Sequence, residues 1–305
     1  MEPNNMEEKS TTQDAIRTGL PVITPSQGDA AANPPGMETS CPNCGAASMP
    51  VSFVYALGRV EKRFRSLAAE KEFAQAVGRA DTAGKTDQQT FHAVLSKREN
   101  RYLVRQLCWV LTIQGMDTYI LQPRDATDIG LLVETIRPVQ SAHDMDVVIG
   151  LRGPIAPPEM CDGLMVPIVV FDQIYSFDGP ALIKAIPKPE KITAEKFGPA
   201  AEELFNRIMR MTDNAGATDE HRALNYLAMR YPAIYGKAAE EFGRDFSLAR
   251  VEVTRSPVSN TRNIVEVGFS YTNRNTDFTE KFCVRVDVTE EFPFLVSKMS
   301  PCYDH

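Results

Sequence analysis

The spacing of apolar residues changes several times along the chain, and each change predicts a different kind of element. Residues 60–78 have apolar side chains at near-helical spacing and predict an amphipathic helix. A second helix is expected over DQQTFHAVLSK, with Thr86 as its N-cap because a hydroxyl there can accept a backbone N–H. Residues 107–123 then form two β-rich arms around the turn at 114–117, which predicts a hairpin.

Two apolar, β-branched segments in the middle of the chain predict strands. Residues 146–153 and 165–177 are bounded by glycine and proline and have the composition of strands inside a sheet. A helix is expected before them over 126–137, with Asp125 as its cap and a proline directly beyond its end.

Helical spacing returns after a proline-containing stretch, and the last sixty residues alternate with period two. The predicted helices are 199–212, 218–231 and 233–243. The predicted strands are VEVTR, NIVEVGFSYTN, TEKFCVRVDVTEEF and FLVSKMS, with residues 273–277 as the turn of the middle pair. Helices and strands therefore come in blocks. This order predicts an α+β fold with mixed, mainly antiparallel sheets and a C-terminal antiparallel meander.

Charge and composition separate the first forty residues from the rest. The chain has 305 residues and a formal net charge of −7, and residues 1–40 contain six acidic and two basic side chains. This segment also has five prolines and no aromatic residue, so it cannot bury enough apolar surface to offset its ordering entropy. We expect a flexible acidic tail over 1–40, or a docking segment that folds on a partner. The folded domain is expected over 41–305, and a subdomain boundary can lie near 186–198.

The same arithmetic excludes some classes of partner and location. An acidic balance argues against binding nucleic acid through its phosphates. The chain has no apolar run long enough for a transmembrane helix, and its acidic, polar start does not have the pattern of a secretory signal. We therefore expect a cytoplasmic protein that binds neither nucleic acid nor membrane.

Six cysteines are too few in a chain of this length for a disulfide scaffold, so reduced thiols are expected. Cys41-Pro-Asn-Cys44 has the spacing of half of a tetrahedral zinc site. Cys161 is the best placed residue to extend that site, because it lies in an accessible loop, whereas Cys108 and Cys283 lie in apolar stretches and are expected in the core. The predicted cofactor is a structural zinc on Cys41, Cys44 and Cys161. An ordinary pair of thiols and a redox dithiol are the alternatives.

The sequence predicts no catalytic residue and no cofactor-binding residue. GRADTAGKT has one residue too many between its glycines for a phosphate-binding loop, and it follows a helix instead of a strand. None of the four histidines belongs to a protease signature. Asp172 lies in an apolar strand, where burial would raise the pKa of a carboxyl group. It is expected to face the polar side of the strand or to pair with Arg152; the alternative is that it is such a perturbed, functional acid.

Several longer stretches resemble one protein family. They are FVYALGRV, EKEFAQ, NRYL, QLCWVLTI, RGPIAPPEMC, VFDQIYSF and SYTNRN. In this order they resemble the C-terminal domain of the cyanobactin maturation proteases of the PatA and PatG type, over about residues 41–305. The resemblance implies a place in the biosynthesis of ribosomally made, post-translationally modified cyclic peptides.

These 305 residues do not contain the Ser, His and Asp motifs of the subtilisin-like protease domain, so we expect a departure from that architecture. Proteolytic and cyclising activity therefore does not carry over, and the family domain is itself of unknown function. One hypothesis is a non-catalytic accessory domain, expected as a homodimer, that binds the precursor peptide or scaffolds other biosynthetic enzymes. The other is a peptide-modifying enzyme built around Asp172, Arg152 and the loop Glu159–Cys161.

Overall fold

The computed structural model describes the main part of the chain from Ser52 onward. The described residues are 52–80, 82–139, 141, 143–186, 194–211, 213–256 and 261–302. They belong to one compact unit, Met49–His305. The predicted tail over 1–40, the cysteines Cys41 and Cys44, and most of the predicted boundary near 186–198 lie outside the described residues.

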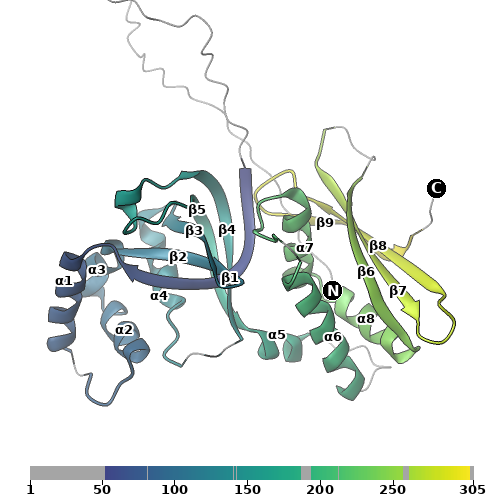
Figure 1. Cartoon of the computed structure of the whole chain (residues 1–305), viewed down its shortest axis with the longest axis horizontal. Helices are drawn as coiled ribbons and strands as arrows, with labels where there is room; N and C mark the ends of the chain where they lie inside the picture. The colour runs from purple at the N-terminus through teal and green to yellow at the C-terminus, as the bar shows by residue number, and fades with distance from the viewer. Residues whose placement is uncertain are drawn as a thin grey trace, which may run out of the picture. The chain divides into compact units, whose positions relative to one another are not determined.

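The first half is a closed five-stranded barrel (Figure 1). Its strands are β1 (Ser52–Phe64), β2 (Leu107–Ile113), β3 (Met116–Pro123), β4 (Asp144–Ile155) and β5 (Pro167–Asp178). They close in the order β1-β2-β3-β5-β4, and all neighbours are antiparallel except β3 and β5. The predicted hairpin over 107–123 and both predicted central strands are therefore present.

β1 changes its partner half-way along, and this change creates a corner of the barrel. Residues up to Gly58 pair with β4, and residues from Arg59 onward pair with β2. The backbones approach so closely there that a Cβ atom on Gly58 would lie 2.4 Å from the carbonyl oxygen of Thr112. At Gly150, beside a bulge in the β4–β5 pairing, a Cβ atom would lie 2.3 Å from the carbonyl oxygen of Val170.

Short helices accompany the barrel strands. They are α1 (Leu67–Gly78), α2 (Asp87–Leu95), η1 (Arg98–Asn100), α3 (Arg101–Gln106), η2 (Ala126–Asp128), α4 (Ile129–Glu134) and η3 (Pro158–Met160). Thr86 caps α2 as predicted: its hydroxyl accepts the N–H of Gln89, whose side chain accepts the N–H of Thr86 in return. Asp125 caps the first turn of the segment predicted as one helix over 126–137.

The predicted helix over 60–78 is wrong in its first part. The strand β1 continues to Phe64, and α1 begins only at Leu67. Apolar residues four positions apart satisfy a strand as well as a helix, so the spacing alone does not decide. Tertiary partners select the strand, because 59–64 pair with β2 and Arg63 donates two hydrogen bonds to Asp117, at 2.8 and 2.6 Å.

The second half consists of helices that pack on an open sheet. The helices are α5 (Gly179–Ala185), α6 (Ala194–Met209), α7 (Asp219–Arg230) and α8 (Ala233–Gly243). The strands are β6 (Phe246–Arg255), β7 (Ile264–Asn273), β8 (Thr279–Asp287) and β9 (Phe294–Pro301). They pair in chain order as an antiparallel meander. The predicted α+β class with its C-terminal meander is confirmed.

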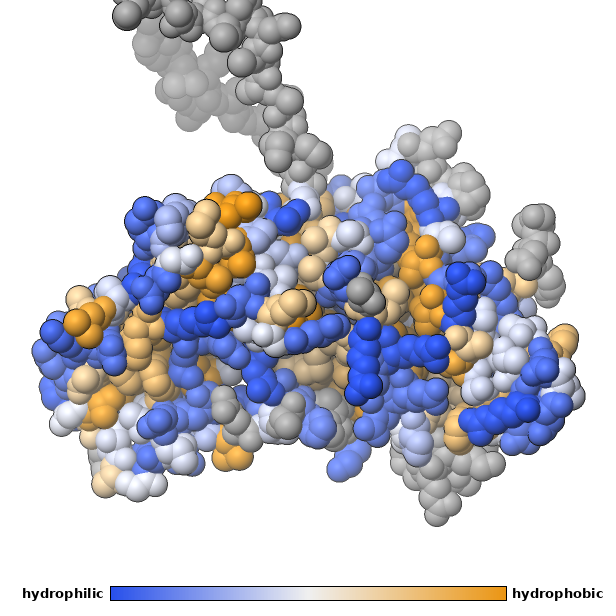
Figure 2. Space-filling model, in the orientation of Figure 1, coloured by the Kyte–Doolittle hydropathy of each residue, from blue (hydrophilic) through white to orange (hydrophobic). Residues whose placement is uncertain are grey.

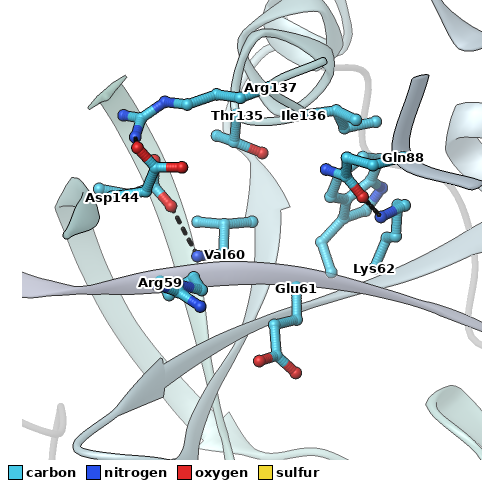
Figure 3. Close-up of a pocket in the computed structure, with 11 residues that line it drawn as sticks. Arg59, Val60, Glu61, Lys62, Gln88, Thr135, Ile136, Arg137 and Asp144 are labelled. Carbon is cyan, nitrogen blue, oxygen red and sulfur yellow. Dashed lines mark hydrogen bonds and ion pairs between the residues drawn. The ribbon is translucent and has the colours of Figure 1, made fainter. Parts of the chain in front are cut away.

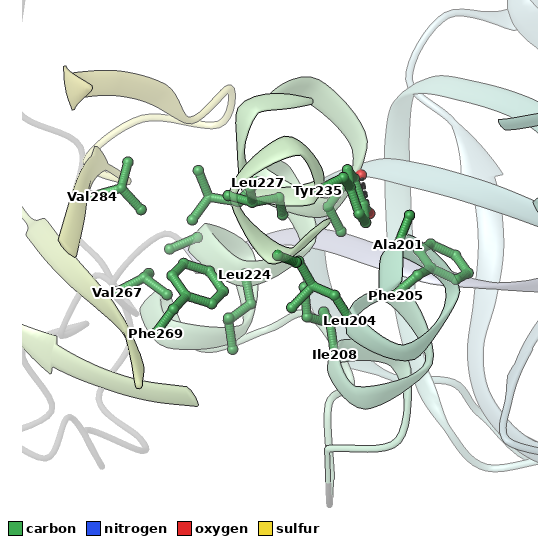
Figure 4. Close-up of a cluster of buried hydrophobic side chains, with 14 of the residues drawn as sticks. Ala201, Leu204, Phe205, Ile208, Leu224, Leu227, Tyr235, Val267, Phe269 and Val284 are labelled. Atoms are coloured by element: carbon green, nitrogen blue, oxygen red, sulfur yellow. Dashed lines mark hydrogen bonds between the residues drawn. The ribbon is translucent and has the colours of Figure 1, made fainter. Parts of the chain in front are cut away.

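One apolar core joins the helices to both sets of strands. In Figure 4, Leu224 and Leu227 of α7 lie between the sheet residues Val267 and Phe269 and the side chains of α6. The same cluster includes Tyr55 of the barrel. Asn225 is fully buried and donates a 2.8 Å hydrogen bond to the carbonyl oxygen of Tyr55, so a polar contact fixes α7 on β1. No helix among the described residues has the length and apolar character to cross a membrane.

The four described cysteines are paired as two disulfides, in place of the reduced thiols that we expected. Cys108 bonds to Cys161, with 5.6 Å between the Cα atoms. Cys283 bonds to Cys302, with 5.3 Å between the Cα atoms. The first bond joins β2 to the segment after η3, and the second joins β8 to the end of β9.

Candidate functional site

A cavity of about 310 Å³ lies at the barrel corner where β1 changes its partner (Figure 3). Its described lining residues are Arg59, Val60, Glu61, Lys62, Gln88, Trp109, Thr135, Ile136, Arg137, Asp144 and Asp146. They come from β1, β2, α2, the segment after α4, and β4. The volume is at the small end of ligand sites, and the lining is charged instead of mainly apolar. Such a cavity suits a small charged group.

Asp146 forms the buried end of this charged lining. It is 4% exposed, and its Oδ2 atom accepts a 2.7 Å hydrogen bond from the N–H of Val60. Its Oδ1 atom accepts a hydrogen bond from the hydroxyl of Ser176. Burial raises the pKa of Asp146, and these two hydrogen bonds lower it in part. Asp146 is the β4 residue paired with Gly58, and its carboxylate reaches Val60, two residues beyond the point where β1 stops pairing with β4.

The two arginines of the cavity are engaged by the fold. Arg137 forms an ion pair with Asp144 and donates to the carbonyl oxygens of Met145 and Phe177, at 3.2 and 2.9 Å. Arg59 donates to the carbonyl oxygen of residue 141 at 3.2 Å. These guanidinium groups tie the segment before β4 to the barrel and add positive charge to the cavity.

Lys62 is held differently. Its ammonium donates a 2.7 Å hydrogen bond to Oε1 of Gln88 and lies 4.4 Å from the ring centre of Phe91. Burial lowers its pKa, and the charge of Glu61 opposes that shift. Among the described residues, no carboxylate lies within ion-pair distance of this ammonium. An anionic group that reached this ammonium would accept a charge-assisted hydrogen bond from it.

The described lining residues do not include serine, cysteine or histidine. The hydroxyl of Thr135 is already donated to the carbonyl oxygen of Leu132 at 2.8 Å. This set of side chains therefore lacks the nucleophile and base arrangement of acyl-transfer enzymes. What it offers chemically is recognition of charge.

Asp172 does not have the partner that we expected. It forms a 2.7 Å ion pair with Arg124, which follows directly after β3, and the same guanidinium lies 3.2 Å from Glu291. Burial raises the pKa of Glu291 to about 7, and the hydrogen bond and charge of Asp172 add to that shift while Arg124 opposes it. The perturbed acid of this region is thus Glu291, from the loop between β8 and β9.

The other residues named with Asp172 are spread over the barrel surface. Arg152 is exposed on β4, and Glu159 is exposed on η3. Cys161 is buried and bonded to Cys108, so its sulfur has no thiolate for a metal while the disulfide is intact. No described group of three or more His, Cys, Asp or Glu residues could hold a metal ion. Zinc binding by Cys41, Cys44 and Cys161 stays a prediction.

The sequence did not point to Lys62 or Asp146. One signal for Lys62 was present: it lies two residues from each of the apolar Val60 and Phe64, and residues two apart share one face of a strand. Asp146 carried no such signal, because an acid at the start of an apolar strand is common at a strand boundary. Only the pairing of β1 with β4 brings it to the cavity.

Comparison with known proteins finds one matching family and one similar solved structure. The sequence matches the family described as "PatG Domain" over residues 53–261. A solved structure described as "PatG Domain of Unknown Function" is similar, with a TM-score of 0.66 and 21% identity, covering 82% of this chain and 98% of the other. At that identity the likeness concerns the fold alone. A search of curated proteins gave no match.

Proposed function

Because the chain belongs to the PatG domain family, we propose that it is a non-catalytic accessory domain in the biosynthesis of cyanobactin-like peptides. In this role it binds a precursor peptide through the cavity at the barrel corner, and presents it to partner enzymes. Membership of this family supports a role beside peptide maturation, and the charged cavity offers a means of holding a peptide.

The observation that carries the proposal is the position of Lys62. Its ammonium uses one donor on Gln88 and is oriented by Phe91, so further donors are available to a carboxylate that enters the cavity. A peptide offers such a carboxylate at an acidic side chain or at its C-terminus. The remaining lining groups are tied to the fold, as Arg137 is by Asp144, so the site is formed before the ligand arrives.

Binding is tested by calorimetric titration of the full chain with its precursor peptide. A charge-assisted hydrogen bond is worth about 1.5–3 kcal/mol, so Lys62→Gln should weaken binding about 10- to 100-fold. Lys298→Gln is the matched control, because Lys298 is exposed on β9 in the other half of the molecule. Equal affinity of the two variants, or no binding by the unmodified protein, would refute the proposed site.

The proposal includes a homodimer in the cytoplasm. Three exposed apolar side chains from β9 and the loop before it support self-association: Phe292, Phe294 and Val296 are 51%, 47% and 42% exposed. On the face drawn in Figure 2, the apolar residues form small areas that hydrophilic residues separate. Light scattering at several protein concentrations measures the oligomeric state, and a monomer throughout would remove the dimer from the proposal.

One observation favours the second candidate function, a peptide-modifying enzyme. Asp172 and Glu291 face each other beside Arg124, and the pKa of Glu291 is raised to about 7, which suits an acid–base group near neutral pH. A mass shift of the precursor peptide that disappears in both Asp172→Asn and Glu291→Gln would establish this function. If the peptide mass did not change, the enzyme function would be refuted and the accessory role would remain the proposed function.

A further inference from the structure

Four exposed basic side chains lie on the short helical segment that joins α2 to β2. They are Lys97, Arg98, Arg101 and Arg105, and together they are called the basic face here. Arg98 and Arg101 are three positions apart, and Arg101 and Arg105 are four apart, so they share one side of the consecutive helices η1 and α3. Glu99 is the single acidic residue of residues 97–105, so this segment has a net charge of +3 in a chain of net charge −7.

The charges of the basic face are not compensated within the described part of the chain. No described carboxylate lies within ion-pair distance of any of its four side chains, whereas Arg63 of the same barrel is paired with Asp117. Like charges three or four positions apart on a helix repel each other and destabilise it. An acidic ligand would remove this repulsion.

The opposite side of the same helical segment is fixed to the barrel. Leu103 and Val104 are buried in the apolar cluster of the barrel. The side-chain amide of Asn100 is buried and donates a 2.8 Å hydrogen bond to the carbonyl oxygen of Val94. The indole of Trp109 donates a 3.0 Å hydrogen bond to the carbonyl oxygen of Val104. The backbone of the basic face is therefore ordered before a ligand arrives, which reduces the entropy lost on binding.

A hollow of about 360 Å³ lies beside the basic face, between the end of α1 and the start of α3. These two helices pack against each other at one end of the barrel (Figure 1). Arg79 from the end of α1 and Lys97 line the hollow, and the half-exposed ring of Tyr102 adds an aromatic surface. Glu99 is the one acid among its described lining residues. An acidic side chain that enters the hollow meets two cations.

We propose that the basic face and this hollow form a docking surface for an acidic, extended segment of a partner protein. Alternate residues of an extended peptide point the same way and are about 7 Å apart, close to the rise of about 5.4 Å between successive helical turns. Successive acidic side chains can therefore reach successive cations of the basic face. Arg98, Arg101 and Arg105 suit this partner, because a guanidinium group donates two parallel hydrogen bonds to one carboxylate.

The extent of the basic face favours an acidic peptide over a nucleic acid. Its four cations occupy about two helical turns, whereas a phosphate polymer is bound by a longer or wider positive surface. A polymer that extended beyond the basic face would meet a protein of net negative charge, which repels it. The docking surface is also distinct from the corner cavity, since the two share no described lining residue.

The test is a titration of a fluorescein-labelled octaglutamate peptide with the full chain at low salt, followed by fluorescence anisotropy. We expect saturable binding that weakens as the salt concentration rises, because exposed charges are screened. The variant Arg98→Gln/Arg101→Gln should bind about tenfold more weakly, since one exposed ion pair contributes up to about fivefold. The charge-reversed variant Arg98→Glu/Arg101→Glu should show no binding.

Arg250→Gln/Lys298→Gln is the matched control, because it removes the same charge from exposed positions on β6 and β9 of the open sheet. It should keep the affinity of the unmodified protein. Repeating the comparison in a Lys62→Gln background excludes any contribution from the corner cavity, so this test and that of the proposed function can fail independently. Circular dichroism checks that each variant is folded.

Three results would overturn the proposal. The first is that octaglutamate does not bind at low salt. The second is that the Arg98→Gln/Arg101→Gln variant and the control variant have the same affinity for it. The third is that a thymidine octanucleotide, or a vesicle containing phosphatidylserine, binds more tightly than octaglutamate and is lost in Arg98→Gln/Arg101→Gln, because the surface would then recognise phosphate.

Discussion

The barrel and the C-terminal sheet solve the same problem, the free edge of a sheet, in different ways. The barrel closes on itself, so each of its five strands has two neighbours. The sheet β6–β9 stays open and has edges at β6 and β9. At β6, Arg207 donates to the carbonyl oxygens of Leu248 and Ala249, both at 2.8 Å. At β9, the hydroxyl of Tyr231 accepts the N–H of Met299 at 3.0 Å. The open sheet thus depends on side chains where the barrel depends on closure.

The two solutions make different demands on the sequence. Closing a five-stranded barrel brings backbones together at Gly58 and Gly150, where no side chain fits. β1 also changes its neighbour from β4 to β2 as the barrel closes. Beyond that change, the N–H of Val60 donates its hydrogen bond to the carboxylate of Asp146. The charged cavity forms at this corner. The site is therefore a consequence of how the barrel closes, and the open sheet has no equivalent corner.

The largest expected effect comes from filling the barrel corner. Gly58→Ala would place a methyl group 2.4 Å from a backbone oxygen that belongs to a paired strand and has little freedom to move. We expect a loss of about 3 kcal/mol or more in the free energy of unfolding, measured by urea denaturation. The cavity should be distorted together with the fold.

Gly268→Ala is the matched substitution in the open sheet. Its methyl group would meet the Cε atom of Lys281 at 3.2 Å, a flexible side-chain atom that can move aside. The free energy of unfolding should therefore change by less than about 1 kcal/mol. If the two alanine variants were equally destabilised, barrel closure would not be the source of the difference.

A smaller effect is expected where the two regions meet. Glu291, from the sheet, faces Asp172 and Arg124 of the barrel, and its pKa is raised from 4.5 to about 7. The folded state therefore holds a proton between these values that the unfolded state releases. Stability is greatest below pH 4.5 for this group and falls as the pH rises to about 7, by about 1–3 kcal/mol.

Glu291→Gln isolates this contribution, because an amide does not titrate. The difference in unfolding free energy between the variant and the unmodified protein should grow from pH 5 to pH 7.5. Glu290→Gln is the control, as Glu290 is the neighbouring acid of the same loop. A pH profile that Glu291→Gln leaves unchanged would show that the proton is held elsewhere.

The smallest expected effect concerns the sheet edge. Arg207→Ala removes two hydrogen bonds that an exposed side chain donates to the β6 backbone. The free energy of unfolding should fall by about 1 kcal/mol. The uncovered edge should also increase association of the protein, measured by light scattering. Arg210→Ala, at an exposed position one turn later, should change neither quantity. If both variants had the same stability and the same association, Arg207 would not protect the β6 edge.

Elements whose partners are close in sequence were predictable. The hairpin over 107–123 and the C-terminal meander depend on neighbouring strands joined by short turns, so alternation and turn residues suffice. The cap at Thr86 is equally local. The course of the chain from residue 60 to 64 was not predictable in this way, because its strand state depends on pairing with β2, more than forty residues away.

The candidate site shows the same division. The Cys-x-x-Cys motif and the hypothesis that Asp172 is a functional acid came from the sequence, because spacing and apolar context are local properties. The actual partners of Asp172 are Arg124 and Glu291, and Glu291 is more than one hundred residues away. Burial and charge pairing are set by such contacts, so the residue whose pKa is raised to about 7 could not be named in advance.

The sequence by itself determined the order and type of most elements, the α+β class and the family, because these depend on local periodicity and on ordered motifs. Only the tertiary structure decided that the first strands close into a barrel and that Lys62 and Asp146 line one cavity. It also decided that Cys108 lies against Cys161. These outcomes depend on which distant strands pair and in what register, and register is fixed by the packing of the whole core.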